Sequence, residues 1–580
     1  MRDRRANHRI RLLLLTFGLL FVVAVGRAAW VQGAQHDRFS KMAVTQHRET
    51  IEVPAGRGTI YDRTGEPLAI GEQATTIYAD PRNIADAQRA AVVAGKTLGL
   101  DANALYPMLK DRSKGFVYVA RKADPVKAET LSKREIPGLG FYPEELRAYP
   151  QGTVASHVLG FAGTDNHGLD GLERSLDKTL SGRPGFETII KDPFGRAIDV
   201  VTSRAERPGK NVTLTIDHQI QSNAEQILAR TVRQFGARGA AAIVMDPRTG
   251  AILAMANYPT FNANNFSAAA PDARRNRAVT DAYEPGSTFK IVTIAGALED
   301  NVVSPTSTFT LAPTIQVADR VIHEAHTRGT EVMSVKEILS QSSNVGTITI
   351  AEKLGSGELA AWIDRFGFGR QTGIDYPGES SGLVLPLQDW SGSTIGTVPI
   401  GQGIAVTPLQ MVSAYATIGN GGVRVTPHLV GKVGSKRVRG NRGTRVVSSH
   451  TANRMMSMFR DVVLEGTGTQ AAIPGYTVAG KTGTAQKAGP NGYMPGRYFA
   501  SFVGFFPADN PELCISIVFD EPKQGYYGGQ VAAPVFKQVA QLAANYLNLR
   551  PDHGSDDALP GQFVEKTNRA ALTAIAARKP

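Results

Sequence analysis

The chain has 580 residues and a mass of 62.0 kDa, too long for one ordinary domain, and its 42% hydrophobic content excludes wholesale disorder. Its single cysteine, Cys514, excludes an intramolecular disulfide and any metal site built from several thiolates. The formal charge of +12 is compatible with nucleic acid, an anionic membrane surface or another anionic polymer as a partner.

The first 32 residues combine a basic start with an apolar run. Five arginines precede Leu12, residues 12–25 carry no charge, and residues 28–31 extend the apolar stretch to about 20 residues, the length that spans a bilayer. Two interpretations stay open: a membrane anchor, or a signal peptide cleaved near Ala24-Val25-Gly26. In both cases the positive-inside rule places the chain after residue 32 outside the cytoplasm, which argues against nucleic acid as a partner.

The next part of the chain has the pattern of a scaffold. Residues 33–53 are polar and basic, as in a juxtamembrane linker, and Arg63-Thr64-Gly65 predicts a tight turn between two short strands. Residues 70–205 mix strand and helix patterns, and nothing there gathers a nucleophile, a base and an acid. We therefore expect residues 54–205 to carry no chemistry of their own.

A second folded unit is expected over residues 206–550. Helix patterns cover residues 220–235 and 535–546, and strand patterns lie near both ends of the unit, at residues 213–217, 239–246, 250–257, 499–506 and 513–520. This arrangement predicts an antiparallel sheet built from both ends, with a helical insertion between them. The polar tail, residues 551–580, predicts disorder apart from a short helix at 570–577.

The first catalytic motif is Ser287-Thr288-Phe289-Lys290. A Pro-Gly pair precedes it and an apolar run follows, which predicts a helix that begins near Ser287 and places Lys290 one turn later on the same face. A lysine beside a serine in a dry site has a lowered pKa and can take the serine proton. Taken alone, the motif is weak evidence of catalysis, because an N-cap serine followed by a solvated lysine is the more common explanation of this pattern.

Two further motifs follow in a fixed order. Ser342-Ser343-Asn344 lies where a polar segment meets an apolar run, and Lys481-Thr482-Gly483-Thr484 follows residues of strand character. The order S-x-x-K, S-x-N, K-T-G is that of penicillin-binding proteins and serine β-lactamases. Three independent motifs in this order argue for a serine acyl-transfer site.

With these motifs in place, the chain resembles a class B penicillin-binding protein, a membrane-anchored D,D-transpeptidase of peptidoglycan synthesis, over about residues 10–550. Other segments similar to that family are RGTIYDRTG at 57–65, GQGIAVTPLQ at 401–410, YGG at 527–529 and AAPVF at 532–536. The resemblance favours the membrane anchor over the signal peptide. It is closer to the cell-division (septal) type than to the elongation type, which stays an alternative.

The resemblance implies an α+β penicillin-binding transpeptidase fold, in which helices and a helical subdomain flank an antiparallel sheet. An elongated α+β scaffold and a single transmembrane helix would precede it. The expected parts are a cytoplasmic tail at 1–11, an anchor at 12–32, a linker at 33–53, a dimerisation or pedestal-like scaffold at 54–205, a transpeptidase domain at 206–550 and a tail at 551–580.

The resemblance also implies a role for each motif residue. Ser287 would be the nucleophile, Lys290 its base and Ser342 a proton relay, with Lys481 supplying positive charge. The backbone N–H groups of Ser287 and Thr484 would form the oxyanion hole. Substrate would be held by Asn344, Thr482, Gly483 and Thr484.

Partners and location follow from the same resemblance. The implied substrates are peptidoglycan stem peptides, a D-Ala-D-Ala donor and an amine acceptor, with no metal and no cofactor. The protein would be a single-pass plasma (inner) membrane protein with a cytoplasmic N-terminus and an extracytoplasmic catalytic domain. A polytopic membrane glycan polymerase and divisome proteins would be its partners, and β-lactams would acylate Ser287.

Two other functions were weighed. A β-lactamase would need a glutamate that activates water, commonly in E-x-x-L-N, and neither residues 352–355 nor 358–361 match this pattern. A non-catalytic β-lactam sensor or structural subunit stays open, although the intact motif set argues for activity.

Two motif-like segments lack their required context. Residues 378–382 match G-x-S-x-G, but prolines at 377 and 386 predict a loop rather than the strand and helix of a nucleophile elbow. His323-Glu324-Ala325-His326 is one residue short of H-E-x-x-H, so we do not expect a metal site there.

Overall fold

A computed structural model describes residues 2–33, 35, 48–53, 55–191, 197–438, 440, 443–490 and 492–552. Most of the expected linker and nearly all of the expected tail, with its helix at 570–577, lie outside these residues. The chain divides into two compact units, one of residues 1–56 and 182–209 and the other of residues 57–181 and 210–580.

The first unit contains one long helix and a small sheet. Helix α1 (Arg2–Gly33) includes the stretch Ile10–Gly33, which is long and apolar enough to cross a membrane and has none of its surface buried by protein. Its length and composition fit a single membrane-spanning segment. The sheet has the antiparallel order β1-β6-β7, from strands β1 (Arg48–Val53), β6 (Gly185–Lys191) and β7 (Ala197–Arg204).

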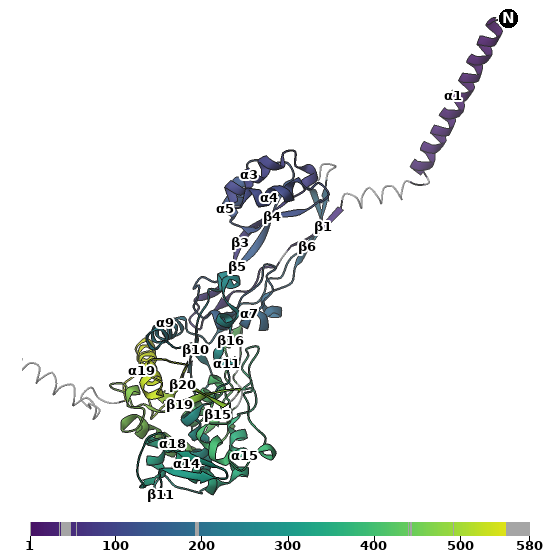
Figure 1. Ribbon diagram of the computed structural model, residues 1–580. Coiled ribbons are helices and arrows are strands. Elements are labelled where there is room, and N and C mark those ends of the chain that lie inside the picture. Colours follow the sequence, from purple (N-terminus) through teal and green to yellow (C-terminus); the bar gives the residue numbers. More distant parts are fainter. Residues whose placement is uncertain are drawn as a thin grey trace, which may run out of the picture. The chain divides into compact units, whose positions relative to one another are not determined.

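The second unit begins with the scaffold. Its main strands are β2 (Ile60–Tyr61), β3 (Pro67–Ala79), β4 (Val117–Ala123) and β5 (Leu139–Ala148), with β3 paired to the other three. The predicted turn at residues 63–65 joins β2 to β3, but β3 has 13 residues and is not the short strand that we expected. The helices α3 (Ala87–Leu98), α4 (Ala102–Lys110) and α5 (Pro125–Ser132) gather beside these strands in Figure 1.

The helices α3, α4 and α5 cover one face of this sheet. Every second side chain of a strand points to that face. Ile77 and Ala79 of β3 and Val117 and Val119 of β4 point into a core that they share with the alanines and leucines of α3, α4 and α5. Short helices α6 (Ser156–Leu159), α7 (Gly171–Ser175) and α8 (Asp177–Leu180) follow β5.

Arg57, the first residue of the RGTIYDRTG segment, forms buried ion pairs. The Arg57 guanidinium donates to Glu173 at 2.7 Å and to Asp177 at 2.7 Å, and Arg147 donates to the other Glu173 oxygen at 2.6 Å. Arg57 and Glu173 are almost fully buried. Loss of one partner of such a network leaves an uncompensated buried charge, so these contacts hold residue 57 against α7 and α8.

The rest of the second unit is built on a five-stranded antiparallel sheet in the order β10-β9-β21-β20-β19. Its strands are β9 (Gly239–Met245), β10 (Ile252–Tyr258), β19 (Ala479–Gly489), β20 (Gly492–Phe506) and β21 (Leu513–Asp520). Strands from the two ends of this region therefore lie side by side, because β9 pairs with both β10 and β21. This confirms the predicted antiparallel sheet and its 239–257 hairpin, but the strand predicted at 213–217 is β8 (Val212–Leu214), which pairs with β2 and with β16 (Val430–Val433) instead.

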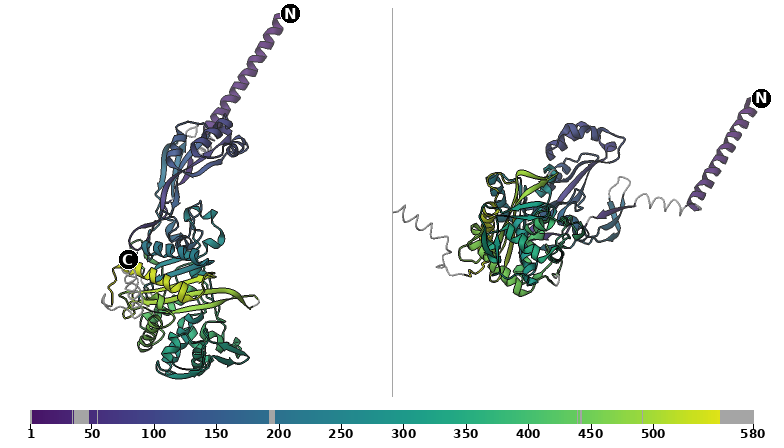
Figure 2. Two further views of the ribbon diagram at one scale, coloured as in Figure 1. Left: turned by 60° about the vertical axis from the view of Figure 1, so that its left-hand side comes forward. Right: turned by 60° about the horizontal axis from the view of Figure 1, so that its bottom comes forward.

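Helices cover both faces of this sheet (Figure 2). On one face, α9 (His218–Phe235) and α19 (Gly528–Leu547) pack against Val244 and Phe502; on the other, α12 (Lys290–Glu299), α17 (Pro408–Gly419) and α18 (Ser449–Leu464) pack against Ile243 and Val503. Neighbouring strand residues point to opposite faces, so each strand contributes to two cores.

A helical subdomain adjoins the second of these faces. It contains α13 (Val335–Ser340), α14 (Asn344–Leu354) and α15 (Ser356–Phe366), with the small hairpins β11 (Thr308–Leu311)–β14 (Glu331–Ser334) and β12 (Thr314–Val317)–β13 (Arg320–His323). Trp362 of α15 is buried and donates a hydrogen bond to Asp300 at 2.7 Å, which ties the subdomain to the end of α12.

Candidate active site

Residues of all three predicted motifs line one cavity of about 420 Å³. Ser287, Ser342 and Asn344 line it together with Thr482 and Thr484, although these residues come from three distant parts of the chain. The buried Lys290 and Lys481 lie directly behind them, each with none of its surface exposed. Polar residues thus converge in a concave site, as expected for binding and catalysis.

Ser287 lies in a 3₁₀ turn, η3 (Gly286–Phe289), and the α-helix α12 begins only at Lys290. A helix therefore begins near Ser287, as predicted, but its first turn is of the 3₁₀ type. The turn is fixed from two sides: the Thr288 hydroxyl donates to Pro285 O at 2.8 Å, and the buried Tyr415 hydroxyl donates to Thr288 O at 2.9 Å. Three residues per turn still place Lys290 directly behind Ser287.

Lys290 contacts the second motif. Its ammonium donates to Ser342 O at 2.6 Å, to Ser342 Oγ at 3.3 Å and to Asn344 Oδ1 at 3.0 Å. Burial, partly offset by the negative charge of Glu324, lowers the pKa of Lys290 to about 7. A neutral lysine is therefore readily available near neutral pH, which is the state that a general base needs.

The second motif is held in an unusual backbone conformation by a glutamate. Ser342 has φ +61°, in the left-handed region, immediately before α14. Glu324 accepts hydrogen bonds from Asn344 N at 2.8 Å, Val345 N at 3.1 Å and Ser343 Oγ at 2.6 Å. These bonds satisfy the first N–H groups of α14 and fix the three residues that follow Ser342.

Arg328 supports Glu324 in turn. It forms an ion pair with Glu324 and donates to Ser343 Oγ at 2.9 Å. Neither residue was predicted in this role. Glu324 lies inside the segment that we compared with H-E-x-x-H, but the backbone N–H groups that it binds belong to Asn344 and Val345, some 20 residues away, which no local pattern reveals.

The third motif lies on β19, the outermost strand of the sheet. Gly483 lets this strand approach the Ser287 turn, because a Cβ at this position would lie 2.4 Å from Ser501 Oγ and 2.8 Å from Pro285 O. Gly528, in the YGG segment, is required in the same way, since a Cβ there would lie 2.3 Å from Gly483 O. These glycines account for close packing around the site.

The threonines of the third motif are already oriented by neighbours. The hydroxyls of Thr482 and Thr467 lie 2.6 Å apart, and the Thr484 hydroxyl accepts a hydrogen bond from Gly528 N at 3.0 Å. A strand at the edge of a sheet has backbone groups that no neighbouring strand pairs. This position suits the predicted use of the Thr484 N–H in an oxyanion hole together with that of Ser287.

Lys481 is more deeply desolvated than the sequence suggested. Its ammonium donates to Thr482 O at 3.2 Å and to Thr482 Oγ1 at 3.3 Å. Burial and the nearby Lys290 lower the pKa of Lys481 well below its ordinary value. This direction works against the positive charge that the resemblance implied for Lys481, and a substrate carboxylate bound nearby would raise the pKa again.

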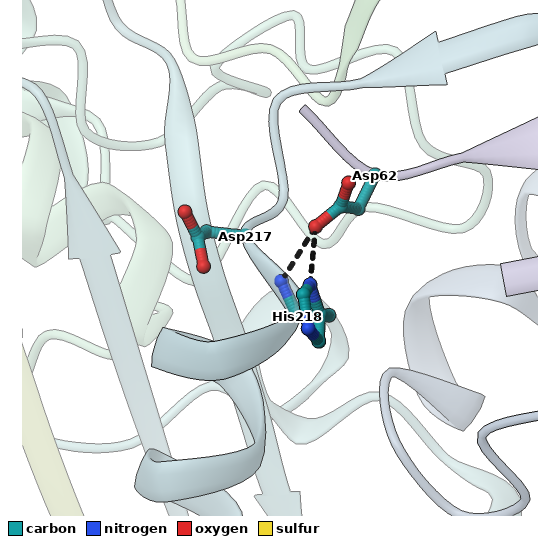
Figure 3. Close-up of side chains that lie close together, drawn as sticks. All are labelled: Asp62, Asp217 and His218. Carbon is teal, nitrogen blue, oxygen red and sulfur yellow. Dashed lines mark hydrogen bonds and ion pairs between the residues drawn. The ribbon is translucent and has the colours of Figure 1, made fainter. Parts of the chain in front are cut away.

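Possible metal ligands gather at a different place from the one that we considered. In the described part of the chain, Asp62, Asp217 and His218 have ligand atoms within 4.8 Å of one another (Figure 3), whereas no such group contains His323 or His326. Asp62 accepts from His218 Nδ1 at 2.6 Å, from His218 N at 3.1 Å and from Thr64 N at 2.7 Å, and Asp217 caps α9. Protein N–H donors thus already occupy Asp62, and the cluster is explained as a junction between the β2–β3 turn and α9.

The G-x-S-x-G match at residues 378–382 lies in a loop, as predicted. Residues 378–382 form an irregular segment without a preceding strand or a following helix, and Ser380 N bonds to Val279 O at 2.9 Å. A nucleophile elbow needs both of these elements.

Comparisons with known proteins agree with this geometry. Residues 240–541 match the family described as penicillin binding protein transpeptidase domain, and residues 52–214 match the penicillin-binding protein dimerisation domain. The chain is 35% identical to peptidoglycan D,D-transpeptidase FtsI of Escherichia coli (strain K12), over 93% of this chain and 92% of that protein. It is 34% identical to penicillin-binding protein PbpB of Mycolicibacterium smegmatis, over 95% and 92% of the two chains.

A solved structure of a penicillin-binding protein is also similar to this chain. The crystal structure of penicillin binding protein 3 from Mycobacterium tuberculosis, complexed with aztreonam, superposes with a TM-score of 0.68 at 31% identity, covering 87% of this chain and 98% of that one. The fold, the motif cavity and relatives that cover nearly the whole chain lead to one conclusion: the chain belongs to the class B penicillin-binding proteins, of the FtsI type.

Proposed function

We propose that the protein is a peptidoglycan D,D-transpeptidase that cross-links stem peptides through an acyl-enzyme on Ser287. The observation that carries this proposal is the joint presence of Ser287, a buried Lys290 with a pKa of about 7, and Ser342 at one cavity. The name of the relative FtsI, peptidoglycan D,D-transpeptidase, supports the same reaction.

In the first half-reaction, Ser287 Oγ attacks the carbonyl carbon of the penultimate D-Ala. Neutral Lys290 takes the hydroxyl proton, and the oxyanion is held by the N–H groups of Ser287 and Thr484, an arrangement generally worth a few kcal/mol per donor. The C–N bond then breaks. Ser342, which hydrogen-bonds Lys290, relays a proton to the departing D-Ala amine, leaving an ester on Ser287.

In the second half-reaction, an amine from a neighbouring stem peptide attacks this ester. The amine loses a proton, the ester C–O bond breaks and Ser287 regains its proton, so the new amide is the cross-link. Asn344 would bind a substrate amide, and Thr482 and Thr484, beside Gly483, would hold the terminal carboxylate next to Lys481. A β-lactam acylates the same serine because it mimics the acyl-D-Ala-D-Ala end.

The domain boundaries, the membrane topology and the protein partners are inferred from the resemblance to class B penicillin-binding proteins. The expected boundaries are those given above, with residues 54–205 as the scaffold and 206–550 as the transpeptidase domain. The N-terminus would be cytoplasmic and the catalytic domain extracytoplasmic, as the five arginines before Leu12 indicate. A membrane glycan polymerase and divisome proteins would contact the scaffold during septal wall synthesis.

Two experiments test the proposal. Purified protein with a D-Ala-D-Ala donor peptide and an amine acceptor is expected to form cross-linked product, whereas labelling by fluorescent penicillin without product would support the sensor alternative. Depletion of the protein is expected to give filamentous cells, and rounded cells would instead support the elongation type.

A further inference from the structure

A second cavity, of about 740 Å³, lies in the scaffold and is larger than the one at Ser287. It is a groove between α3 and α5. On α3, Arg89, Val93, Lys96 and Thr97 line it, a spacing of three and four residues that places them on one face of the helix. Val126, Lys127 and Thr130 line it from α5 with the same spacing.

The groove exposes apolar side chains to solvent. Val126 of α5 is 71% exposed and Val92 of α3 is 47% exposed, and Val93 and Ala90 of α3 also line the groove. Single exposed valines are common on protein surfaces. Two of them on the two helices that line one groove instead indicate a site where another apolar surface packs.

The rim of the groove is positively charged. Arg89, Lys96, Lys127 and Arg134 all line it and are exposed, and none of them forms an ion pair with another residue in the described part of the chain. Two acidic residues also line the groove, Asp86 and Glu135. The Asp86 carboxylate is engaged in capping α3, where it accepts a hydrogen bond from Arg89 N at 3.0 Å.

We propose that the groove between α3 and α5 binds an acidic amphipathic helix of a partner protein. Helix α3 has 12 residues, so at about 1.5 Å per residue the groove runs for some three helical turns. The apolar side chains in this groove fit the apolar stripe of a helix, and the four rim cations fit acidic side chains on its flanks. The inference concerns the scaffold and does not depend on the chemistry at Ser287.

The direct test measures binding of a fluorescein-labelled 18-residue helical peptide that carries leucines on one face and glutamates on the other. Full-length protein in detergent is expected to bind it, and added salt is expected to weaken binding. The double variant Lys96→Glu/Lys127→Glu is expected to lower affinity by at least roughly tenfold, because two attractive contacts become repulsive. Lys178→Glu, an exposed lysine of α8 outside the groove, is the matched control and should leave affinity unchanged.

Two further peptides separate the contributions of shape and charge. A peptide with serines in place of the leucines and one with lysines in place of the glutamates are both expected to bind at least tenfold more weakly. Val126→Asp is expected to lower affinity for the leucine–glutamate peptide. Fluorescent penicillin labelling should be unchanged in every variant, which shows that each is folded and separates failure here from failure of the proposed reaction.

The site of binding can be mapped with cysteines, because the native Cys514 is fully buried. An environment-sensitive dye on Thr97→Cys or Thr130→Cys is expected to respond to the leucine–glutamate peptide.

Equal affinity of the Lys96→Glu/Lys127→Glu variant and the unchanged protein would overturn the proposal. Full displacement of the peptide by soluble dioctanoyl-phosphatidylglycerol would also overturn it, in favour of a lipid headgroup.

Discussion

The buried ammonium of Lys290 donates hydrogen bonds to both the carbonyl oxygen and the hydroxyl of Ser342, at 2.6 and 3.3 Å. These two residues lie 52 positions apart, and Ser342 has the left-handed backbone that places its carbonyl toward the lysine. Protonation of Lys290 and the position of Ser342 are therefore coupled. In the described residues, Lys290 bonds Ser342 and Asn344 and not the Ser287 hydroxyl.

The first prediction concerns pH. Burial lowers the pKa of Lys290 to about 7, and a lysine accepts the Ser287 proton only when it is neutral. The rate of acylation by fluorescent penicillin should therefore rise with pH, with a midpoint near 7, and level off above it. Lys290→Arg should lower the rate at least roughly a hundredfold at all pH values, because arginine stays protonated. A flat pH profile in the unchanged protein would contradict this role.

The second prediction concerns Glu324 as a positioning residue. Glu324→Gln replaces one carboxylate oxygen by a donor, so one of the bonds to Asn344 N and Val345 N is lost. We expect acylation to slow by roughly ten- to a hundredfold, equivalent to about 1.4–2.7 kcal/mol. The unfolding temperature should also fall, because the largely buried Arg328 loses its ion-pair partner. Glu352→Gln, an exposed residue of α14 that forms no ion pair in the described part of the chain, is the control and should acylate normally.

The third prediction concerns the approach of β19 to the Ser287 turn. Gly483→Ala would place a methyl group 2.4 Å from Ser501 Oγ and 2.8 Å from Pro285 O, so the strand and the turn must separate. We expect a loss of about 1–3 kcal/mol in unfolding free energy and a strong loss of penicillin labelling. Gly357→Ala in α15 has open space around its Cβ and should leave both unchanged or slightly raise stability. Normal labelling of Gly483→Ala would refute the close-packing role.

The fourth prediction concerns acid stability. Burial raises the pKa of Asp62, but hydrogen bonds from Thr64 and His218 outweigh this and lower it to about 2, from about 3.8. Since the folded-state pKa is depressed, the stabilisation is present above pH 4 and is lost as pH falls toward 2. Asp62→Asn should cost about 2 kcal/mol in thermal unfolding at neutral pH, and less in acid. The exposed Asp389→Asn is the control.

A metal titration tests whether the cluster of Asp62, Asp217 and His218 binds an ion. Because N–H donors already occupy Asp62, chelators and added Ca²⁺ or Zn²⁺ should leave the unfolding temperature unchanged. A rise in unfolding temperature with a metal ion that disappears in Asp62→Asn would show that the cluster is a metal site.

Elements with a local periodicity were predictable from sequence. The 239–257 hairpin, the strands near 499–520 and helix α9 follow from alternation, turn residues and helical spacing, and the three motifs located the chemistry. The Pro-Gly break located the start of the helix near Ser287, but it does not distinguish a 3₁₀ turn from an α-helix. Glu324 escaped notice because its partners are distant backbone groups, and Asp62 and His218 meet across 156 positions.

The most direct test of the account is acylation of Ser287→Ala. Incubation with fluorescent penicillin, followed by gel fluorescence and mass spectrometry of the proteolytic peptides, is expected to give one adduct on the peptide containing Ser287 in the unchanged protein and none in the variant. The variant should unfold at nearly the same temperature, since Ser287 lines an open cavity. Labelling of Ser287→Ala at the normal rate would contradict the account and place the nucleophile elsewhere.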